Sequence, residues 1–376
     1  MVRVIRGLLT IVIGVGMVSP IVSLAEPTTG TETVFVMTNN ADKNEVIAYA
    51  RAADGSFLEN HRYETEGRGS GGVNDPLGSQ GSLTLSSDHS LLFAANAGSG
   101  TVSVFRVRRG ELSLADKAPT GGSEPVAVAQ WQNLVYVLNA AGSGSVVGFH
   151  LSNEGRLQQI QNSTAFLSAS GAGGASATIS PDGRFLVVTE RVANNIDVFQ
   201  IQADGTLANI VVNPSPGPGT FAARFAPDGK LIVSETGPAG AVNAAAVSSY
   251  SVLSGGTLSA ISQSVPTFGS ANCWNAITPN GQAVYVSNAA SSTISGFTIG
   301  KSGSLTPIGA TVVGSNPEGS GNLDIAVSSD GKYVYTLNSA AGTIGVFSVQ
   351  ADGALTNIGE IPGLPKSVGF NGIAAL

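Results

Sequence analysis

Short hydrophobic runs alternate with glycine-rich and polar turns along almost the whole chain. Residues 176–207 show the pattern well, with three β-like runs and a last short run separated by a polar loop and by turns at 181–183 and 203–205. Residues 275–305 and 324–355 repeat the same order. Runs of this length joined by such turns predict a four-stranded antiparallel sheet in each copy.

The second β run of each copy ends on a polar residue. These ends are Asn39, Asn96, Asn139, Glu190, Glu235, Asn288 and Asn338. Successive ends lie 43 to 57 residues apart, which suits one four-stranded blade per copy. Seven copies predict an all-β, seven-bladed β-propeller.

The two ends of the chain predict how the ring closes. The first copy starts directly at its second run, TVFVMTN (33–39), and therefore lacks an innermost strand. The final residues NGIAAL (371–376) are similar to an innermost run, NLDIAV (322–327). We expect the C-terminal strand to complete the first blade, which protects strand edges from aggregation.

Several repeat motifs are typical of one known family. They are the SPDG turn (180–183), the runs LVYVLN (134–139) and AVYVSN (283–288), and the runs TISGF (293–297) and TIGVF (343–347). With these motifs the chain resembles the lactonase-type seven-bladed β-propeller family, which includes bacterial phosphogluconolactonases and fungal carboxymuconate lactonising enzymes. The resemblance covers about residues 33–376 and implies a carboxylic-ester (lactone) hydrolase. The motifs belong to the scaffold, and a fold does not determine a function.

The N-terminus has the features of a secretion signal. Arg3 and Arg6 precede an apolar stretch at 8–22, and small residues at 23–25 suit cleavage near Ala25. We expect a signal peptide at 1–25, a single propeller domain at 26–376 and a secreted or periplasmic location. An uncleaved anchor is the alternative, because the stretch is nearly long enough to span a bilayer.

Charge and cysteine content limit the partners. The formal net charge is −7, and removal of residues 1–25, which hold two arginines and no acidic residue, leaves −9. Such an acidic chain is poorly suited to nucleic acid or anionic lipid, and we expect a monomer without a membrane span after cleavage. Cys273 is the only cysteine, so no internal disulfide can form, and we expect it to be a buried thiol.

The blade register predicts a site at one end of the propeller. Loops from second to third strands and connections between blades emerge at the same end, so Glu190 and Glu235 are expected there. Two carboxylates at a restricted opening can have separated pKa values, as acid–base catalysis requires. The family resemblance also implies a functional glutamate that matches Ser234-Glu235. We predict Glu235, Glu190 and the adjacent Arg191 as catalytic, with solvated surface charges as the alternative.

Other polar and aromatic residues are expected at the same end. The predicted substrate-binding residues are Asp75, Asn96, Asn139, Trp274, Asn288 and Asn338. The glycine-rich segment 67–81, which contains Arg68, is expected to be a lid. Repeated Asn also has a purely structural interpretation, because Asn favours tight turns at strand ends.

One family motif is absent. Family enzymes commonly have an Arg-His pair where this chain has 218–222, with Ala222 at the histidine position. None of the three histidines, His61, His89 and His150, falls clearly at the predicted site, so a histidine base is not expected. Arg224 is close in sequence, but strand alternation leaves its direction undetermined.

These features favour one function and leave a second. An unphosphorylated sugar or aromatic lactone is the expected substrate, because phosphate binding calls for clustered Arg or Lys. The alternative is a non-catalytic binding propeller for carbohydrate or peptide, with Trp274 and Phe268 as stacking surfaces. No cofactor is expected. A Ca²⁺ site of Glu190, Glu235 and Asp75 is only weakly supported, since no acidic loop of the usual spacing occurs.

Overall fold

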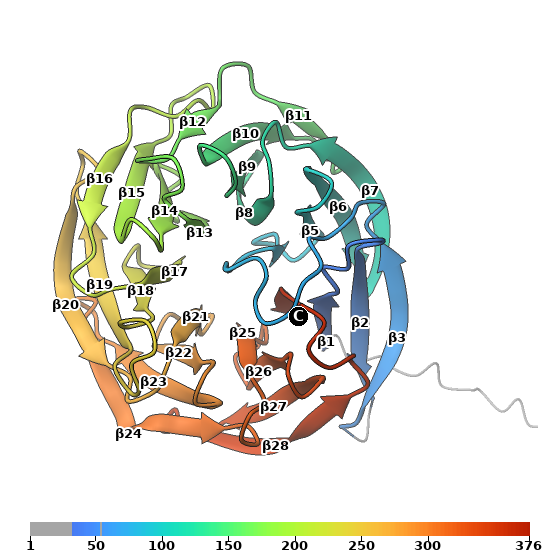
Figure 1. Cartoon of the computed structure of the whole chain (residues 1–376), viewed down its shortest axis with the longest axis vertical. Helices are drawn as coiled ribbons and strands as arrows, with labels where there is room; N and C mark the ends of the chain where they lie inside the picture. The colour runs from blue at the N-terminus through green and yellow to red at the C-terminus, as the bar shows by residue number, and fades with distance from the viewer. Residues whose placement is uncertain (1–31, 53–54) are drawn as a thin grey trace, which may run out of the picture.

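The structure is a computed structural model that describes residues 32–52 and 55–376. Seven antiparallel sheets are arranged around a central axis (Figure 1), which confirms the predicted seven-bladed all-β propeller. The described ranges contain strands and turns but no helix, so no helix there could cross a membrane. The expected signal peptide lies outside the described residues.

The first four blades take up the N-terminal half of the ring. Blade 1 contains β1 (Thr33–Met37), β2 (Glu45–Arg51), β3 (Phe57–Glu64) and the C-terminal β29 (Ile373–Ala375). Blade 2 contains β4 (Leu83–Leu85), β5 (Leu91–Asn96), β6 (Thr101–Arg108) and β7 (Glu111–Pro119). Blade 3 contains β8 (Pro125–Trp131), β9 (Leu134–Asn139), β10 (Ser145–Leu151), β11 (Leu157–Gln159) and the short β12 (Ala165–Phe166). Blade 4 contains β13 (Gly174–Ile179), β14 (Phe185–Glu190), β15 (Asn195–Gln200) and β16 (Val211–Pro214).

The last three blades follow the same order from the axis outward. Blade 5 contains β17 (Thr220–Phe225), β18 (Leu231–Glu235), β19 (Ala246–Val252) and β20 (Leu258–Pro266). Blade 6 contains β21 (Asn272–Ile277), β22 (Ala283–Asn288), β23 (Thr293–Ile299) and β24 (Leu305–Ser315). Blade 7 contains β25 (Asn322–Val327), β26 (Tyr333–Asn338), β27 (Thr343–Val349) and β28 (Leu355–Pro362).

The C-terminal strand closes the ring as predicted. β29 pairs antiparallel with β1, with Val34 opposite Ala375 and Val36 opposite Ile373. It also contacts the innermost strands of both neighbouring blades, β4 and β25. In Figure 1 the C-terminus therefore lies beside β1 near the centre of the ring.

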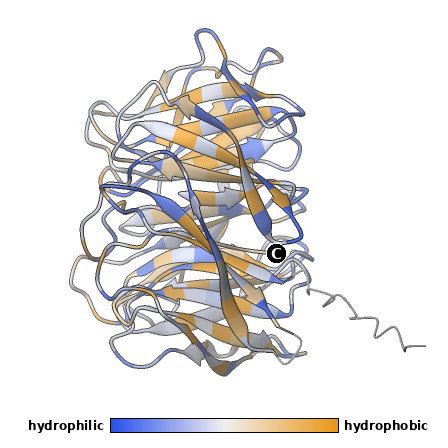
Figure 2. Ribbon diagram, turned by 90° about the vertical axis from the view of Figure 1, so that its right-hand side faces the viewer, coloured by the Kyte–Doolittle hydropathy of each residue, from blue (hydrophilic) through white to orange (hydrophobic). Residues whose placement is uncertain are grey.

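Apolar side chains of the first three strands pack between neighbouring blades. Figure 2 shows that hydrophobic residues are concentrated in the strands, whereas the loops at both ends are mostly polar. Second-strand tyrosines tie adjacent blades together: Tyr136 donates to the carbonyl of Gly205 at 2.8 Å, and Tyr285 donates to that of Gly353 at 2.9 Å. Both acceptors lie in turns of the next blade with positive φ, which glycine adopts without strain.

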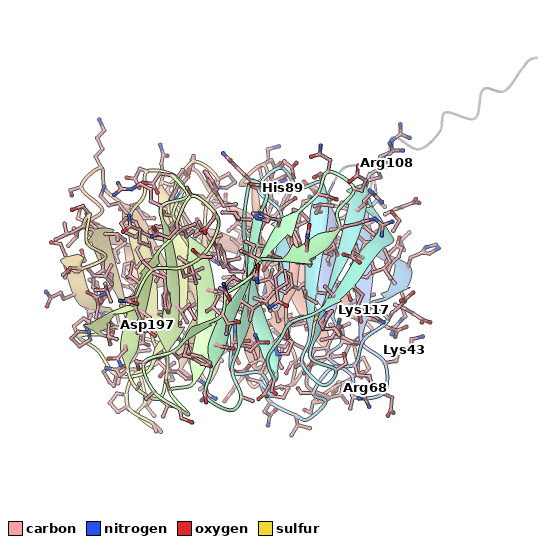
Figure 3. All side chains as sticks on the ribbon, turned by 90° about the horizontal axis from the view of Figure 1, so that it is seen from above. Lys43, Arg68, His89, Arg108, Lys117 and Asp197 are labelled. Atoms are coloured by element: carbon pink, nitrogen blue, oxygen red, sulfur yellow. The ribbon has the colours of Figure 1, made fainter. Side chains whose placement is uncertain are left out.

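The propeller has two ends that differ in their loops. We call the end with the second-to-third-strand loops and the blade-to-blade connections the mouth, and the opposite end the far face. Figure 3 shows Lys43 and Arg68 toward the mouth, and His89 and Arg108 at the far face.

The connection between blades 1 and 2 enters the central channel from the mouth (Figure 1). We call its residues 77–81 the plug. Gln80 donates from its amide nitrogen to the carbonyl of Asn275 at 2.9 Å and to Asp324 Oδ1 at 3.0 Å. Its backbone N–H donates to Ala175, while the carbonyl of Ser79 accepts the indole N–H of Trp274 at 2.8 Å. The lid predicted for 67–81 is therefore wrong for this part, because buried side chains fasten it inside the ring.

Candidate functional site at the propeller mouth

The seven residues predicted to end the second strands lie at the mouth end of their blades. Six of them are the last residues of their strands, and Asn39 lies two residues beyond the end of β1. Their side chains are nevertheless fully buried between the blades, with exposed fractions of 0%. They are Asn39, Asn96, Asn139, Glu190, Glu235, Asn288 and Asn338. None of them presents its side chain to solvent at the opening.

Glycines in the blade-to-blade connections cover these side chains. A Cβ atom on Gly67 would overlap the side chain of Asn96, and one on Gly269 would overlap that of Asn288. Gly217 covers Glu235 in the same way. A connection can approach the strand end this closely only where no side chain intervenes. In the sequence, these glycines indicate that the strand-end side chains are buried. The strand register alone does not indicate this.

A serine on the third strand pairs with the strand-end residue in three blades. The Asn288 amide donates to Ser295 Oγ at 2.8 Å, and that hydroxyl donates to a backbone carbonyl. In blade 5, Ser248 Oγ instead donates to Glu235 Oε1 at 2.6 Å. A hydroxyl both donates and accepts, so the repeat accommodates either an amide or a carboxylate at the same position.

Glu235 is held entirely by hydroxyl groups. Besides Ser248, Ser264 donates to Oε2 at 2.7 Å and Ser215 donates to Oε1 at 3.4 Å. A cavity of about 320 Å³ lies next to this carboxylate, lined by Pro216–Pro218 and Pro266 among others. Three serine hydroxyls already donate to Glu235, so a substrate would compete with them for the carboxylate oxygens. Its catalytic role stays a prediction.

Glu190 forms a buried pair with a second carboxyl group. Ser168 donates to it through both its backbone N–H and its hydroxyl, and Asn195 donates at 3.2 Å. Asp197, on the adjacent strand, is fully buried, and within the described ranges neither of its oxygens has a hydrogen bond of normal geometry. Burial, together with the nearby Glu190, raises the pKa of Asp197 to about 9. Asp197 is therefore protonated at neutral pH and can donate to Glu190.

Asp75 is a carboxylate that does reach the mouth. It is only half-buried, and its Oδ1 accepts the Gly78 N–H at 3.0 Å and the Asn371 amide at 2.8 Å. No hydrogen bond to Oδ2 occurs within 32–52 and 55–376. Burial raises the pKa of Asp75 to about 7, with a smaller upward contribution from Asp324. Such a carboxyl exchanges its proton near neutral pH, as a general base must.

Arg191 lies beside Asp75 at the mouth. Its guanidinium packs on the backbone of Gly78, where an added Cβ would stand 3.0 Å from Nε. Its positive charge also acts to lower the pKa of Asp75. Arg191 remains exposed, so it can approach a bound molecule as well as the carboxylate. The structure therefore brings together two sequence-predicted residues, Asp75 and Arg191, while Glu190 and Glu235 lie beneath the surface.

Trp274 and Cys273 have structural surroundings. Trp274 is fully buried, packs edge to face on Phe221 with ring centroids 5.3 Å apart, and uses its indole N–H on the plug. Burial raises the pKa of the Cys273 thiol, with a further contribution from Asp75, so the thiolate is disfavoured. The contacts of Trp274 are structural, and its role in substrate binding stays a prediction.

Apolar side chains surround the polar centre of the mouth. They come from three blade connections and two second-to-third-strand loops, with exposed fractions of 43% to 77%. They are Val73, Val192, Val242, Phe268 and Val368. The described part of the chain contains no group of three or more His, Cys, Asp or Glu side chains that could hold a metal ion. The mouth thus combines a carboxylate and a guanidinium with an apolar border.

The sequence matches the family model described as Lactonase, 7-bladed beta-propeller over residues 69–172, 130–242 and 246–366. The chain belongs to this family. No match is found among curated proteins.

Solved structures share the fold of this lactonase-family propeller. A candidate 6-phosphogluconolactonase from Bacteroides fragilis superposes with a TM-score of 0.69 at 19% identity, covering 93% of this chain and 98% of that one. The periplasmic gluconolactonase of Pseudomonas aeruginosa gives a TM-score of 0.67 at 20% identity, covering 91% and 99%. At these identities the similarity concerns the fold alone.

Proposed function

We propose that this lactonase-family propeller hydrolyses a lactone at its mouth, with Asp75 as the general base and Arg191 as the cation that stabilises the oxyanion. One observation carries the proposal: a half-buried carboxyl group with a pKa of about 7 keeps one oxygen without a hydrogen bond, beside an exposed arginine. Carboxyl groups with strongly shifted pKa values at an opening are typical of functional sites.

The reaction needs no group beyond these residues, the lactone and water. Asp75 takes a proton from water, and the resulting hydroxide adds to the lactone carbonyl carbon. Arg191 stabilises the negative charge that develops on the carbonyl oxygen. The ring C–O bond then breaks, the carbonyl re-forms, and the departing alkoxide takes the proton held by Asp75. The product is the hydroxy acid.

The surroundings favour an unphosphorylated lactone with an apolar portion. Arg191 is the cation that acts on Asp75, whereas a phosphate calls for a cluster of Arg or Lys. The border of exposed valines and Phe268 offers contacts to an aromatic ring or an acyl chain.

The experiment follows acid release by pH-stat from a panel of aldonolactones, phosphorylated aldonolactones and aromatic lactones. Asp75→Asn is expected to lower kcat/KM by about 10²–10⁴-fold. Arg191→Met is expected to lower it by about 10²–10³-fold. Asp42→Asn and Lys43→Met change exposed residues at the same end of the molecule and serve as matched controls. If no lactone is turned over, the hydrolase proposal fails for these substrates and the binding propeller becomes the better account.

We also infer that the chain is exported after cleavage near Ala25, leaving the acidic domain 26–376. The apolar stretch 8–22 and the small residues at 23–25 support this inference. Intact-mass analysis of protein recovered from outside the cytoplasm is expected to show a chain that begins near Glu26. Recovery of the full-length chain in the membrane fraction would support the uncleaved anchor instead.

A further inference from the structure

Arg224 projects from β17, the innermost strand of blade 5. On the neighbouring strand β18 it lies opposite Ile232, and Ile232 precedes the strand-end Glu235 by three residues. In five other blades the innermost-strand residue at the same register, three residues before the strand-end Asn or Glu, is small. These counterparts are Thr84, Ala129, Thr178, Ala276 and Ala326. Blade 1 has Ile373 at this register, opposite Val36. Arg224 is therefore the one charged side chain in a layer of alanine, threonine and isoleucine.

This layer faces the central channel. Ala129, Thr178, Ala276 and Ala326 retain exposed fractions of 4% to 9%, although they lie on the innermost strands. The charge of Arg224 acts on Asp324, which belongs to blade 7. Blade 6 separates these two blades around the ring, so the interaction runs across the channel.

The described residues provide no hydrogen bond and no ion pair for the Arg224 guanidinium, which is half-buried. Burial lowers the pKa of Arg224, and the negative charge of Asp324 acts in the opposite direction. Asp324 is not an ion-pair partner of Arg224, because its Oδ1 accepts from Gln80 and Ile325 and its Oδ2 accepts from Ile373. A guanidinium in such a place calls for an anion.

We propose that the channel beneath the plug binds one small monovalent anion, such as a halide, at Arg224. A single cation matches a single negative charge, and the carboxylate of Asp324 disfavours ligands of higher charge. Five other blades have small side chains at the same level, and the plug lies on the mouth side. Entry is then from the far face, where each of three turn aspartates pairs with a cation: Asp182 with Arg184, Asp228 with Lys230 and Asp330 with Lys332. This site is independent of lactone hydrolysis.

The direct test is anomalous diffraction from crystals soaked in sodium bromide. A bromide peak is expected beside Arg224 in the wild-type protein and in Arg108→Met, which removes an exposed arginine of the far face. The peak is expected to be absent from Arg224→Met. No peak at this position in the wild type, or an unchanged peak in Arg224→Met, overturns the proposal and indicates that Arg224 is satisfied by water or Asp324.

Thermal unfolding provides a solution measurement that does not depend on crystals. Bromide is expected to raise the Tm of the wild-type protein by more than it raises the Tm of Arg224→Met. A bulky organic anion holds the ionic strength constant in both series. Asp324→Asn removes the nearby negative charge. Half-maximal stabilisation of this variant is therefore expected at a bromide concentration at least about threefold lower than in the wild type. Equal bromide responses of wild type and Arg224→Met contradict the site.

Discussion

The buried carboxylates Glu190 and Glu235 are held by hydroxyl and amide donors and not by cations. Glu235 accepts from three serines, and Glu190 accepts from Ser168 and Asn195. Both stand where other blades have Asn. At the scale of single residues, the hydrogen bonds of a carboxylate indicate its role. Glu190 and Glu235 accept from several donors and stabilise the fold, whereas Asp75 has one oxygen without a hydrogen bond and can act on a substrate.

Glu235→Gln tests the structural role of this residue. The amide cannot accept all the serine hydroxyls in the present geometry, so we expect a loss of about 1–3 kcal/mol in the free energy of unfolding. Lactone turnover per folded molecule is expected to stay at the wild-type level. Chemical denaturation and pH-stat assays measure the two quantities, with the exposed Glu318→Gln as control. A collapse of turnover in a well-folded variant would instead support the catalytic prediction for Glu235.

Asp197 makes stability depend on pH. Its pKa is about 9 in the folded state and 3.8 as the reference value for the unfolded chain. The folded state therefore holds a proton that the unfolded state releases between these values, and the resulting stability is full below about pH 4 and declines as pH rises toward 9. Asp197→Asn, which stays neutral, should flatten this part of the decline.

Urea unfolding from pH 5 to 9 measures the difference between wild type and Asp197→Asn. Other shifted groups, Asp75 among them, are present in both proteins, so the difference isolates Asp197. Asp197→Ser reproduces the serine found at this position in blade 5 and serves as a second neutral variant. Parallel stability curves for all three proteins would contradict the raised pKa.

At the scale of elements, the plug joins distant parts of the ring. Gln80 bonds to Asn275 and Asp324, which are 195 and 244 residues away in sequence. Gln80→Ala leaves buried acceptors without partners, and we expect it to lower the free energy of unfolding by about 2 kcal/mol or more. Gln202→Ala, which removes an exposed amide bonded only to a backbone carbonyl, is the matched control. Equal unfolding midpoints for the two variants would show that the plug adds little stability.

The blades could be predicted from sequence because their determinants are local. Each turn and β run lies within one repeat, and the similarity of 371–376 to 322–327 predicted the closing strand β29. The plug could not be predicted in this way. Its glycines suggested a flexible lid, whereas its place depends on partners in blades 3, 4, 6 and 7 that no local pattern contains.

At the scale of the whole molecule, the ring brings Asp75 of one blade connection next to Arg191 of blade 4. Blade register alone predicted that both lie at the mouth. The same register also placed Glu190 and Glu235 there, but it did not show that glycine-containing connections and serine side chains bury Glu235. The pKa of Asp75 could not be predicted either, because it depends on how deeply the surrounding connections bury the carboxyl group.

The pH dependence of kcat/KM for the best lactone substrate tests the central claim most directly. Since Asp75 must be deprotonated to act as a base, wild-type kcat/KM is expected to rise with pH through about 7 and then level off. In Asp75→Asn this rising limb should disappear and the plateau should fall by about 10²–10⁴-fold. A wild-type profile that is flat across pH 6–8, or a folded Asp75→Asn variant with unchanged kcat/KM, would contradict the assignment of Asp75 as the base.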